Sequence, residues 1–184
     1  MDLFKTVTES QTTLTELMIP SYANFGGKIH GGIIMSLMDK VAYVCSAKHA
    51  GAYCVTASVE DIDFLAPVEV GELVSLMASV NYVGKTSLVV GIKVISENVK
   101  THHVKHTNTS YFTMVAMDDN HIPLQVPGLI LHTDVEIRRF YQGLYRKQLK
   151  KDYRREEARV KTDFEMDQTI EVLKAERCRI ERAK

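Results

Sequence analysis

The stretch GIIMSLMDKVAYVCSAK, residues 32–48, decides the fold expected for this chain of 184 residues. Apolar residues on one face of it recur at spacings of three and four: Ile34, Leu37, Met38, Val41 and Cys45. This spacing predicts a helix. Met35 and Tyr43 make the opposite face partly apolar too. A helix that is apolar over more than half its circumference is expected to be buried rather than to lie on a surface.

The period of the apolar pattern changes to two after this helix. Four segments then read as strands: 54–64, 73–83, 87–96 and 104–117. Residues 11–19 predict one more strand ahead of the helix, ending at Pro20. Connections this short force neighbouring strands to be antiparallel. The sequence therefore predicts an α+β fold, with an antiparallel β-sheet wrapped around a long central helix.

Charge divides the chain into two parts. Residues 1–135 hold 8 Lys, no Arg and 13 acidic residues, whereas residues 136–184 hold 15 basic and 10 acidic residues. Capping-box sequences at Thr133–Glu136 and Thr162–Glu165 predict helices in the second part. We expect a domain at 1–132 and a charged helical C-terminal extension at 133–184.

The basic residues of this extension could bind an anionic membrane, a nucleic acid or a nucleotide. Acidic residues interrupt them, which favours a solvated helix laced with pairs four residues apart. The formal charge of the whole chain is zero, so we expect no nucleic-acid partner. Residues 1–19 lack the features of a signal peptide, and no apolar run is long enough to span a membrane. Three cysteines without framework spacing predict reduced thiols and a cytoplasmic location.

Asp39 lies in the middle of the predicted helix, where a buried carboxylate is costly unless it is paired, hydrogen-bonded or reached by water. It is either a structural group that bonds across an interface or a base that activates water. Residues Gly31 and Gly32 stand at the helix start, where backbone N–H groups lack acceptors and can polarise a carbonyl. Close helix–sheet packing is the alternative role for these glycines. His30 is an acid–base candidate or an ordinary loop residue.

Two further clusters could carry chemistry. His102, His103 and His106 invite a metal interpretation, but no carboxylate stands at a suitable spacing, so we expect no metal. The turn at 84–87 (Gly84, Lys85, Thr86 and Ser87) carries a cation and hydroxyls that could hold a phosphate, although a plain hairpin turn is the better explanation when the turn is taken alone.

Four linked stretches, 20–39, 55–72, 83–87 and 112–118, resemble the hotdog-fold acyl-CoA thioesterases, specifically the cytosolic acyl-CoA hydrolase group. The resemblance covers about residues 12–131. In that family the first stretch runs from Pro-Ser through Asn and Gly-Gly into a helix that continues to Met-Asp or Met-Glu. Lys85 departs from the pattern, because the family more often has Arg there.

The resemblance implies hydrolysis of acyl-CoA thioesters without metal or cofactor. It assigns Asp39 as general base or nucleophile, and Asn24 as the residue that orients water or substrate. The helix start at Gly31 and Gly32 would polarise the thioester carbonyl, and residues 84–87 would contact coenzyme A. The family forms hotdog dimers that assemble into hexamers, so we expect a homo-oligomer.

Two alternatives stay open from the sequence. One is a hotdog domain that binds acyl-CoA as a regulator without hydrolysing it, which a basic extension would suit. The other is a hydratase or dehydratase of the same fold, for which His30 and Asp39 could supply the pair.

Overall fold

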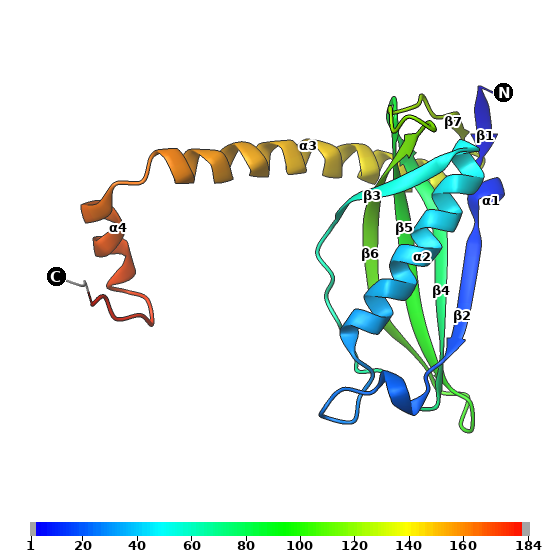
Figure 1. Cartoon of the computed structure of the whole chain (residues 1–184), viewed down its shortest axis with the longest axis horizontal. Coiled ribbons are helices and arrows are strands. Elements are labelled where there is room, and N and C mark those ends of the chain that lie inside the picture. Colours follow the sequence, from blue (N-terminus) through cyan, green and yellow to red (C-terminus); the bar gives the residue numbers. More distant parts are fainter. Residues whose placement is uncertain (1–2, 182–184) are drawn as a thin grey trace. The chain divides into compact units, whose positions relative to one another are not determined.

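The computed structural model describes residues 3–181, apart from the side chain of Asp167 (Figure 1). These residues form two compact units that divide after Gly143. The elements of the first unit are β1 (Phe4–Thr6), α1 (Val7–Ser10), β2 (Thr12–Leu17), a 3-10 helix (Pro20–Tyr22), α2 (Gly31–Ala50), β3 (Tyr53–Val59), β4 (Glu72–Val83), β5 (Ser87–Asn98), β6 (Val104–Met117), β7 (Gly128–Ile130) and the start of α3 (Asp134–Thr162).

The predicted central helix is confirmed as α2, and its ends have local causes. At the start, the His30 ring accepts a hydrogen bond from the backbone N–H of Gly32 at 2.9 Å. At the end, Gly51 takes a left-handed conformation with φ 67°, which glycine adopts without a Cβ clash. Only one face of α2 is buried, however. Asp39 lies on the exposed face, so the expectation of a buried carboxylate is wrong for the single chain.

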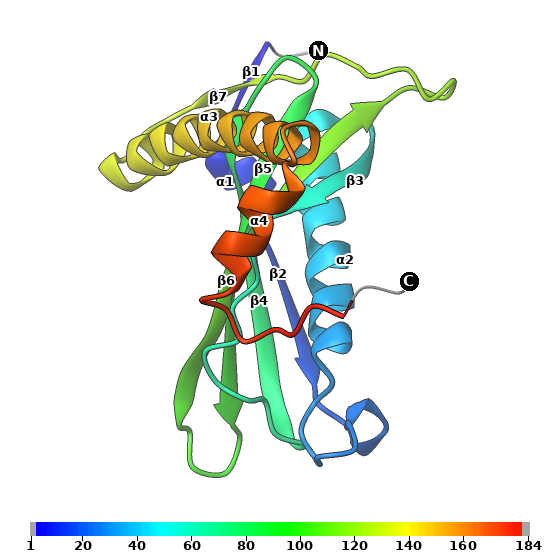
Figure 2. The ribbon, with the colours of Figure 1, turned by 90° about the vertical axis from the view of Figure 1, so that its left-hand side faces the viewer.

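A five-stranded antiparallel sheet curls around α2 in the order β2-β4-β5-β6-β3 (Figure 2). This arrangement confirms the helix-wrapped sheet expected from the pattern. The strand predicted over 54–64 stops earlier, since β3 ends at Val59. Residues 60–68 form no strand, and Asp61, Asp63 and Pro67 in this stretch are poor strand formers. β3 is an edge of the sheet, because it pairs only with β6.

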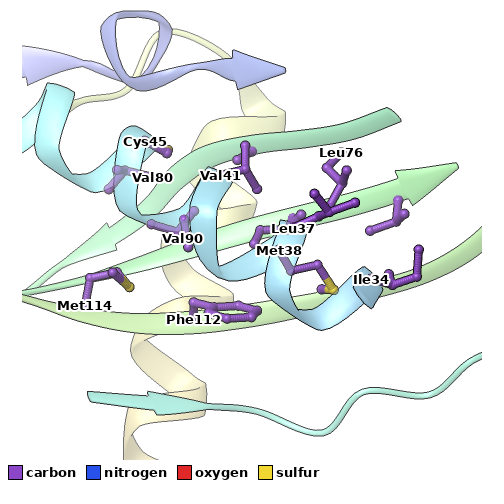
Figure 3. Packing of buried hydrophobic residues seen from close by; sticks show 14 of the residues in the cluster. Ile34, Leu37, Met38, Val41, Cys45, Leu76, Val80, Val90, Phe112 and Met114 are labelled. Carbon is purple, nitrogen blue, oxygen red and sulfur yellow. The ribbon is translucent and has the colours of Figure 1, made fainter. Parts of the chain in front are cut away.

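The core lies between α2 and the facing side of the sheet (Figure 3). Ile34, Leu37 and Met38 of α2 pack here and are at most 4% exposed. Every second residue of β4 and β5 meets them, including Leu76, Val80 and Val90. Cys45 is also buried here, and burial raises the pKa of its thiol to about 12. Such a thiol is protonated and unreactive at neutral pH, which agrees with a packing role.

A short parallel pair, β1 with β7, escaped the sequence patterns. Each strand has three residues, too few to show a period of two. Their pairing joins residues near the N-terminus to residues 128–130. Contacts between such distant segments leave no local mark in a sequence.

The first turns of α3 belong to the first unit. The rings of Phe140 and Tyr82 lie with centroids 5.0 Å apart. A Cβ on the buried Gly143 would sit 2.5 Å from that of Tyr82, so this close approach requires glycine. The compact unit thus extends past the boundary expected at 132.

The second unit holds the rest of α3 and α4 (Met166–Leu173). Lys161 pairs with Glu157 at 2.9 Å and Arg159 with Asp163 at 3.7 Å, both four residues apart. These pairs are of the kind expected for a solvated charged helix. Across the described residues, no helix is both long and apolar enough to cross a membrane.

His49, near the end of α2, gives a prediction about pH. It is fully buried, and its Nε2 donates to the carbonyl of Pro127 at 2.9 Å, while Nδ1 has no partner among the described residues. Burial lowers the pKa of His49 below its ordinary 6.5, the nearby Lys5 acts in the same direction, and Glu9 and the Pro127 carbonyl partly oppose it. The unfolded chain then binds more protons below about pH 6.5, so the free energy of unfolding should fall as the pH drops.

We expect His49→Gln to reduce this pH dependence, since glutamine keeps an N–H donor and does not titrate. Urea unfolding of both proteins at pH 8 and pH 5.5 measures the effect. The stability advantage of the wild type over the variant should shrink at the lower pH. An advantage that stays constant between the two pH values would contradict the prediction.

Candidate active site

Asp39 meets a strand residue across the helix–sheet boundary. The hydroxyl of Thr56 on β3 donates to Asp39 Oδ1 at 2.6 Å. Oδ2 of the same carboxylate has no hydrogen-bond partner among the described residues. One oxygen is therefore held in place, while the other can accept a proton from water.

Asn24 lies in the exposed loop before α2, and its side chain organises that loop. Its Oδ1 accepts from the backbone N–H of Gly26 at 2.9 Å and of Lys28 at 3.2 Å. Its Nδ2 has no acceptor within residues 3–181. The amide is thus fixed by its oxygen and presents a donor to the exterior.

The start of α2 presents backbone donors, as expected for Gly31 and Gly32. The N–H of Gly32 is already taken by His30 Nδ1, which must be unprotonated to accept it. His30 is thereby engaged as a helix cap. His30 also lies far from Asp39, because the seven residues from Gly32 to Asp39 alone rise about 10 Å along the helix axis. The pair that a hydratase would need is therefore not assembled within one chain.

The turn of Gly84, Lys85, Thr86 and Ser87 joins β4 to β5. Thr86 accepts from the N–H of Ala116, whose register partner is Cys54 near the start of β3. The loop into α2 instead lies beside the start of β4, where Ile29 donates to the carbonyl of Val68. Figures 1 and 2 show these two regions at opposite ends of the sheet.

The separation of these two groups of residues is large. β4 has 12 residues, which corresponds to roughly 40 Å at about 3.3 Å per residue. Within one chain, therefore, Asp39 and Thr56 lie together, and Asn24 lies near the helix start. The turn at 84–87 lies far from the helix start.

The other sequence candidates are held in ordinary contacts. His102 faces Glu97 at 3.2 Å, and His106 Nε2 lies 2.8 Å from the hydroxyl of Thr109. Within the described residues, no three histidine, cysteine or acidic side chains are grouped so as to hold a metal ion. A cavity of about 320 Å³, lined by Asn81 and Lys93 among others, lies on the face of the sheet away from α2. It is separate from the residues considered above.

Thr56 is the candidate that the sequence patterns missed. It falls within one of the family-like stretches, but a threonine in a strand has no signature that separates function from β propensity. Its contact with Asp39 exists because β3 runs beside α2. Only the tertiary structure shows this contact.

Comparison with known proteins places these residues in a family. The model of the thioesterase superfamily matches residues 26–102. Protein VdlD of Helicobacter pylori is 45% identical over 145 residues, which span 79% of this chain and 83% of that protein. A crystal structure of an apo-hexameric acyl-CoA thioesterase is 33% identical with a TM-score of 0.79, and the match covers 82% of this chain and 96% of the other.

An acyl-CoA hydrolase from Staphylococcus aureus, solved with butyryl coenzyme A and coenzyme A, is 32% identical with a TM-score of 0.77. The match covers 92% of this chain and 98% of that one. Alanine variants of the same enzyme were solved for an asparagine, an aspartate 15 residues later and a threonine 17 residues after that. Asn24, Asp39 and Thr56 have the same order and the same two spacings. By its fold, its sequence and these relatives, the chain belongs to the thioesterase superfamily, as an enzyme of the hotdog fold.

Proposed function

We propose that this protein hydrolyses acyl-CoA thioesters to a free acid and coenzyme A. The observation that carries the proposal is the carboxylate of Asp39, held through one oxygen by Thr56 at 2.6 Å and free at the other. A domain that only binds acyl-CoA has no need of a base in this arrangement. The shared order and spacing of Asn24, Asp39 and Thr56 with the three residues varied in the S. aureus enzyme support it.

In the proposed reaction, Asp39 takes a proton from water as the water attacks the thioester carbonyl; the C–S bond then breaks, and coenzyme A leaves as a thiolate that takes up this proton. In the other route Asp39 attacks the carbonyl itself, coenzyme A leaves, and water hydrolyses the resulting anhydride to free acid and Asp39. The Nδ2 of Asn24 donates to the water or to the substrate. A backbone N–H at the start of α2 stabilises the negative charge that develops on the carbonyl oxygen. The turn at 84–87, with the ammonium of Lys85, contacts coenzyme A.

We further propose that the site is completed by a second subunit. β3 is an open edge, and the exposed side of α2 with β3 carries large apolar side chains, namely Met35, Tyr43, Val44, Tyr53 and Val59, each at least 40% exposed. Two copies packed through these residues about a two-fold axis would set the α2 helices antiparallel. Each helix start, with its Asn24, would then face the partner's Asp39 and its turn at 84–87. The hexameric relatives support an assembly of three such dimers. We propose a cytoplasmic location, supported by three free cysteines.

The test is a panel of acyl-CoAs from acetyl to palmitoyl, scored by the free thiol released. We expect turnover on at least one chain length. Binding of acyl-CoA without thiol release on any member would favour the regulatory alternative. Loss of the enoyl absorbance of a 2-enoyl-CoA, again without thiol release, would favour the hydratase.

A change at Thr56 tests the hydrogen bond to Asp39. Thr56→Val keeps the branched shape suited to a strand but removes the donor. A hydrogen bond to a charged group is worth about 1.5–3 kcal/mol, so we expect kcat to fall about 10- to 100-fold. The matched control is Thr15→Val, which removes a strand hydroxyl that is hydrogen-bonded to Ser75 at 3.0 Å, away from Asp39. Equal kcat in the two variants would mean that the Thr56 hydroxyl has no role in the mechanism.

We propose that the second unit serves assembly or regulation rather than chemistry, since all the candidate residues lie in the first. A protein ending at Gly143 keeps the contact of Phe140 with Tyr82 and should retain turnover per folded site. We expect its oligomer to be weaker, which sedimentation measures. A folded truncation that binds substrate but shows no turnover would mean that residues after 143 contribute to the active site.

A further inference from the structure

The first turn of α2 offers the backbone N–H of Gly31 as a donor. The N–H of Gly32 donates to His30 Nδ1, and that of Ile33 donates to the His30 carbonyl at 2.9 Å. The N–H of Gly31 has no acceptor among the described residues. If a carbonyl oxygen binds at this helix start, Gly31 is the residue that can donate to it without breaking another hydrogen bond.

The ring of Phe64 lies against this same glycine. A Cβ placed on Gly31 would be 3.3 Å from Phe64 Cζ and 3.5 Å from Cε2. Backbone hydrogen bonds on both sides fix the segment that carries the ring. Before it, Glu60 donates to the carbonyl of Tyr111 at 2.9 Å, and after it, Leu65 donates to that of Thr107 at 2.8 Å.

The Phe64 side chain is only half covered, with an exposed fraction of 47%. One part of the ring touches the helix start, and the rest faces outward with no partner that would bury it in the single chain. The segment brings an apolar ring to a polar helix end. A ring that served only to pack the core would be fully buried instead.

We propose that Phe64 is a positioning residue, whose ring forms the wall beside the Gly31 N–H, excludes water from that donor and holds the thioester carbonyl against it. The proposal rests on the proposed hydrolysis of acyl-CoA. A donor aimed at a developing negative charge stabilises it more where water is excluded. The ring has no hydrogen-bonding group, so it cannot compete with the carbonyl for the N–H.

The test compares three variants over the acyl-CoA panel. Phe64→Ala opens the wall, Phe64→Leu keeps an apolar cover, and Leu65→Ala is the matched control in the same segment. We expect Phe64→Ala to lower kcat about tenfold or more, with a smaller change in KM, because the contact acts on the charge of the transition state. Phe64→Leu should restore most of kcat, and Leu65→Ala should resemble the wild type. The loss should be equal for short and long straight chains, since all share the carbonyl.

Gly31→Ala probes the contact from the other side and retains Phe64. Its methyl group would force the ring away by a few tenths of an ångström, so kcat should fall here too, even if Phe64→Ala fails to fold.

Three results would overturn the proposal: wild-type kcat in Phe64→Ala or, where that variant does not fold, in Gly31→Ala; an equal loss in Leu65→Ala; or a loss confined to long acyl chains. A wild-type protein inactive on every acyl-CoA would instead refute the proposed function and this inference with it.

Discussion

Asp39→Asn should lower the release of thiol from acyl-CoA by about a hundredfold or more, the scale of a general base or nucleophile. Asparagine has nearly the shape of aspartate and can still accept from the Thr56 hydroxyl, so the fold and the 2.6 Å contact have no reason to be lost. It cannot, however, take a proton from water at neutral pH. Steady-state kinetics on the best acyl-CoA of the panel measure the effect.

The control for Asp39→Asn is Asp119→Asn, which removes an exposed carboxylate from the connection after β6. This control should keep wild-type kcat and the same melting temperature. If Asp39→Asn also turns over at the wild-type rate, Asp39 is not the base, and its contact with Thr56 is structural.

Mixing two inactive variants should restore activity if the site is shared between subunits. Asn24→Ala and Asp39→Ala subunits, exchanged at random, give half their dimers as mixed pairs. In the shared arrangement each mixed dimer has one site with both changes and one with neither. Activity should therefore return to about a quarter of the wild-type value, provided the sites act independently.

The matched control is the double variant Asn24→Ala/Asp39→Ala mixed with wild-type subunits. With shared sites, every site of a mixed dimer carries one change, so only the wild-type dimers are active and about a quarter of the activity remains. With sites built inside one subunit, about half remains, and the first mixture recovers nothing. Native mass spectrometry confirms that mixed dimers form, and no recovery in their presence would rule out the shared site.

The regular elements of the fold could be predicted because their causes are local. The spacing of Ile34, Leu37 and Val41 predicts a helix wherever it stands in a chain, and the alternation over 104–117 predicts a strand. The short connections then limit the pairing to antiparallel neighbours. The pairing of β1 with β7 could not be predicted, since it depends on contacts between distant segments. The early end of β3 has a local cause in the poor strand formers Asp61, Asp63 and Pro67, which the apolar pattern over 54–64 did not reveal.

The candidate site divides in the same way. Asn24, His30, Gly31, Gly32 and Asp39 lie in one continuous motif, so the sequence alone could single them out. The sequence did not predict that Asp39 would be exposed, because the helix is apolar on both faces and a pattern cannot tell the core from a subunit interface. We propose that the exposed Met35 and Tyr43 on this second face pack against another copy of the chain.

By itself, then, the sequence determined that a long apolar helix is wrapped by an antiparallel sheet, and that a glycine-rich helix start precedes an aspartate on that helix. These features follow from side-chain periodicity and backbone freedom, which act over a few residues. Tertiary structure alone decided that Thr56 donates to Asp39, that His30 occupies the Gly32 N–H, and that Phe64 lies on Gly31. The Thr56 and Phe64 contacts join segments separated by 17 or more residues. The His30 contact depends on a ring orientation set by the surrounding chain, which no local pattern specifies.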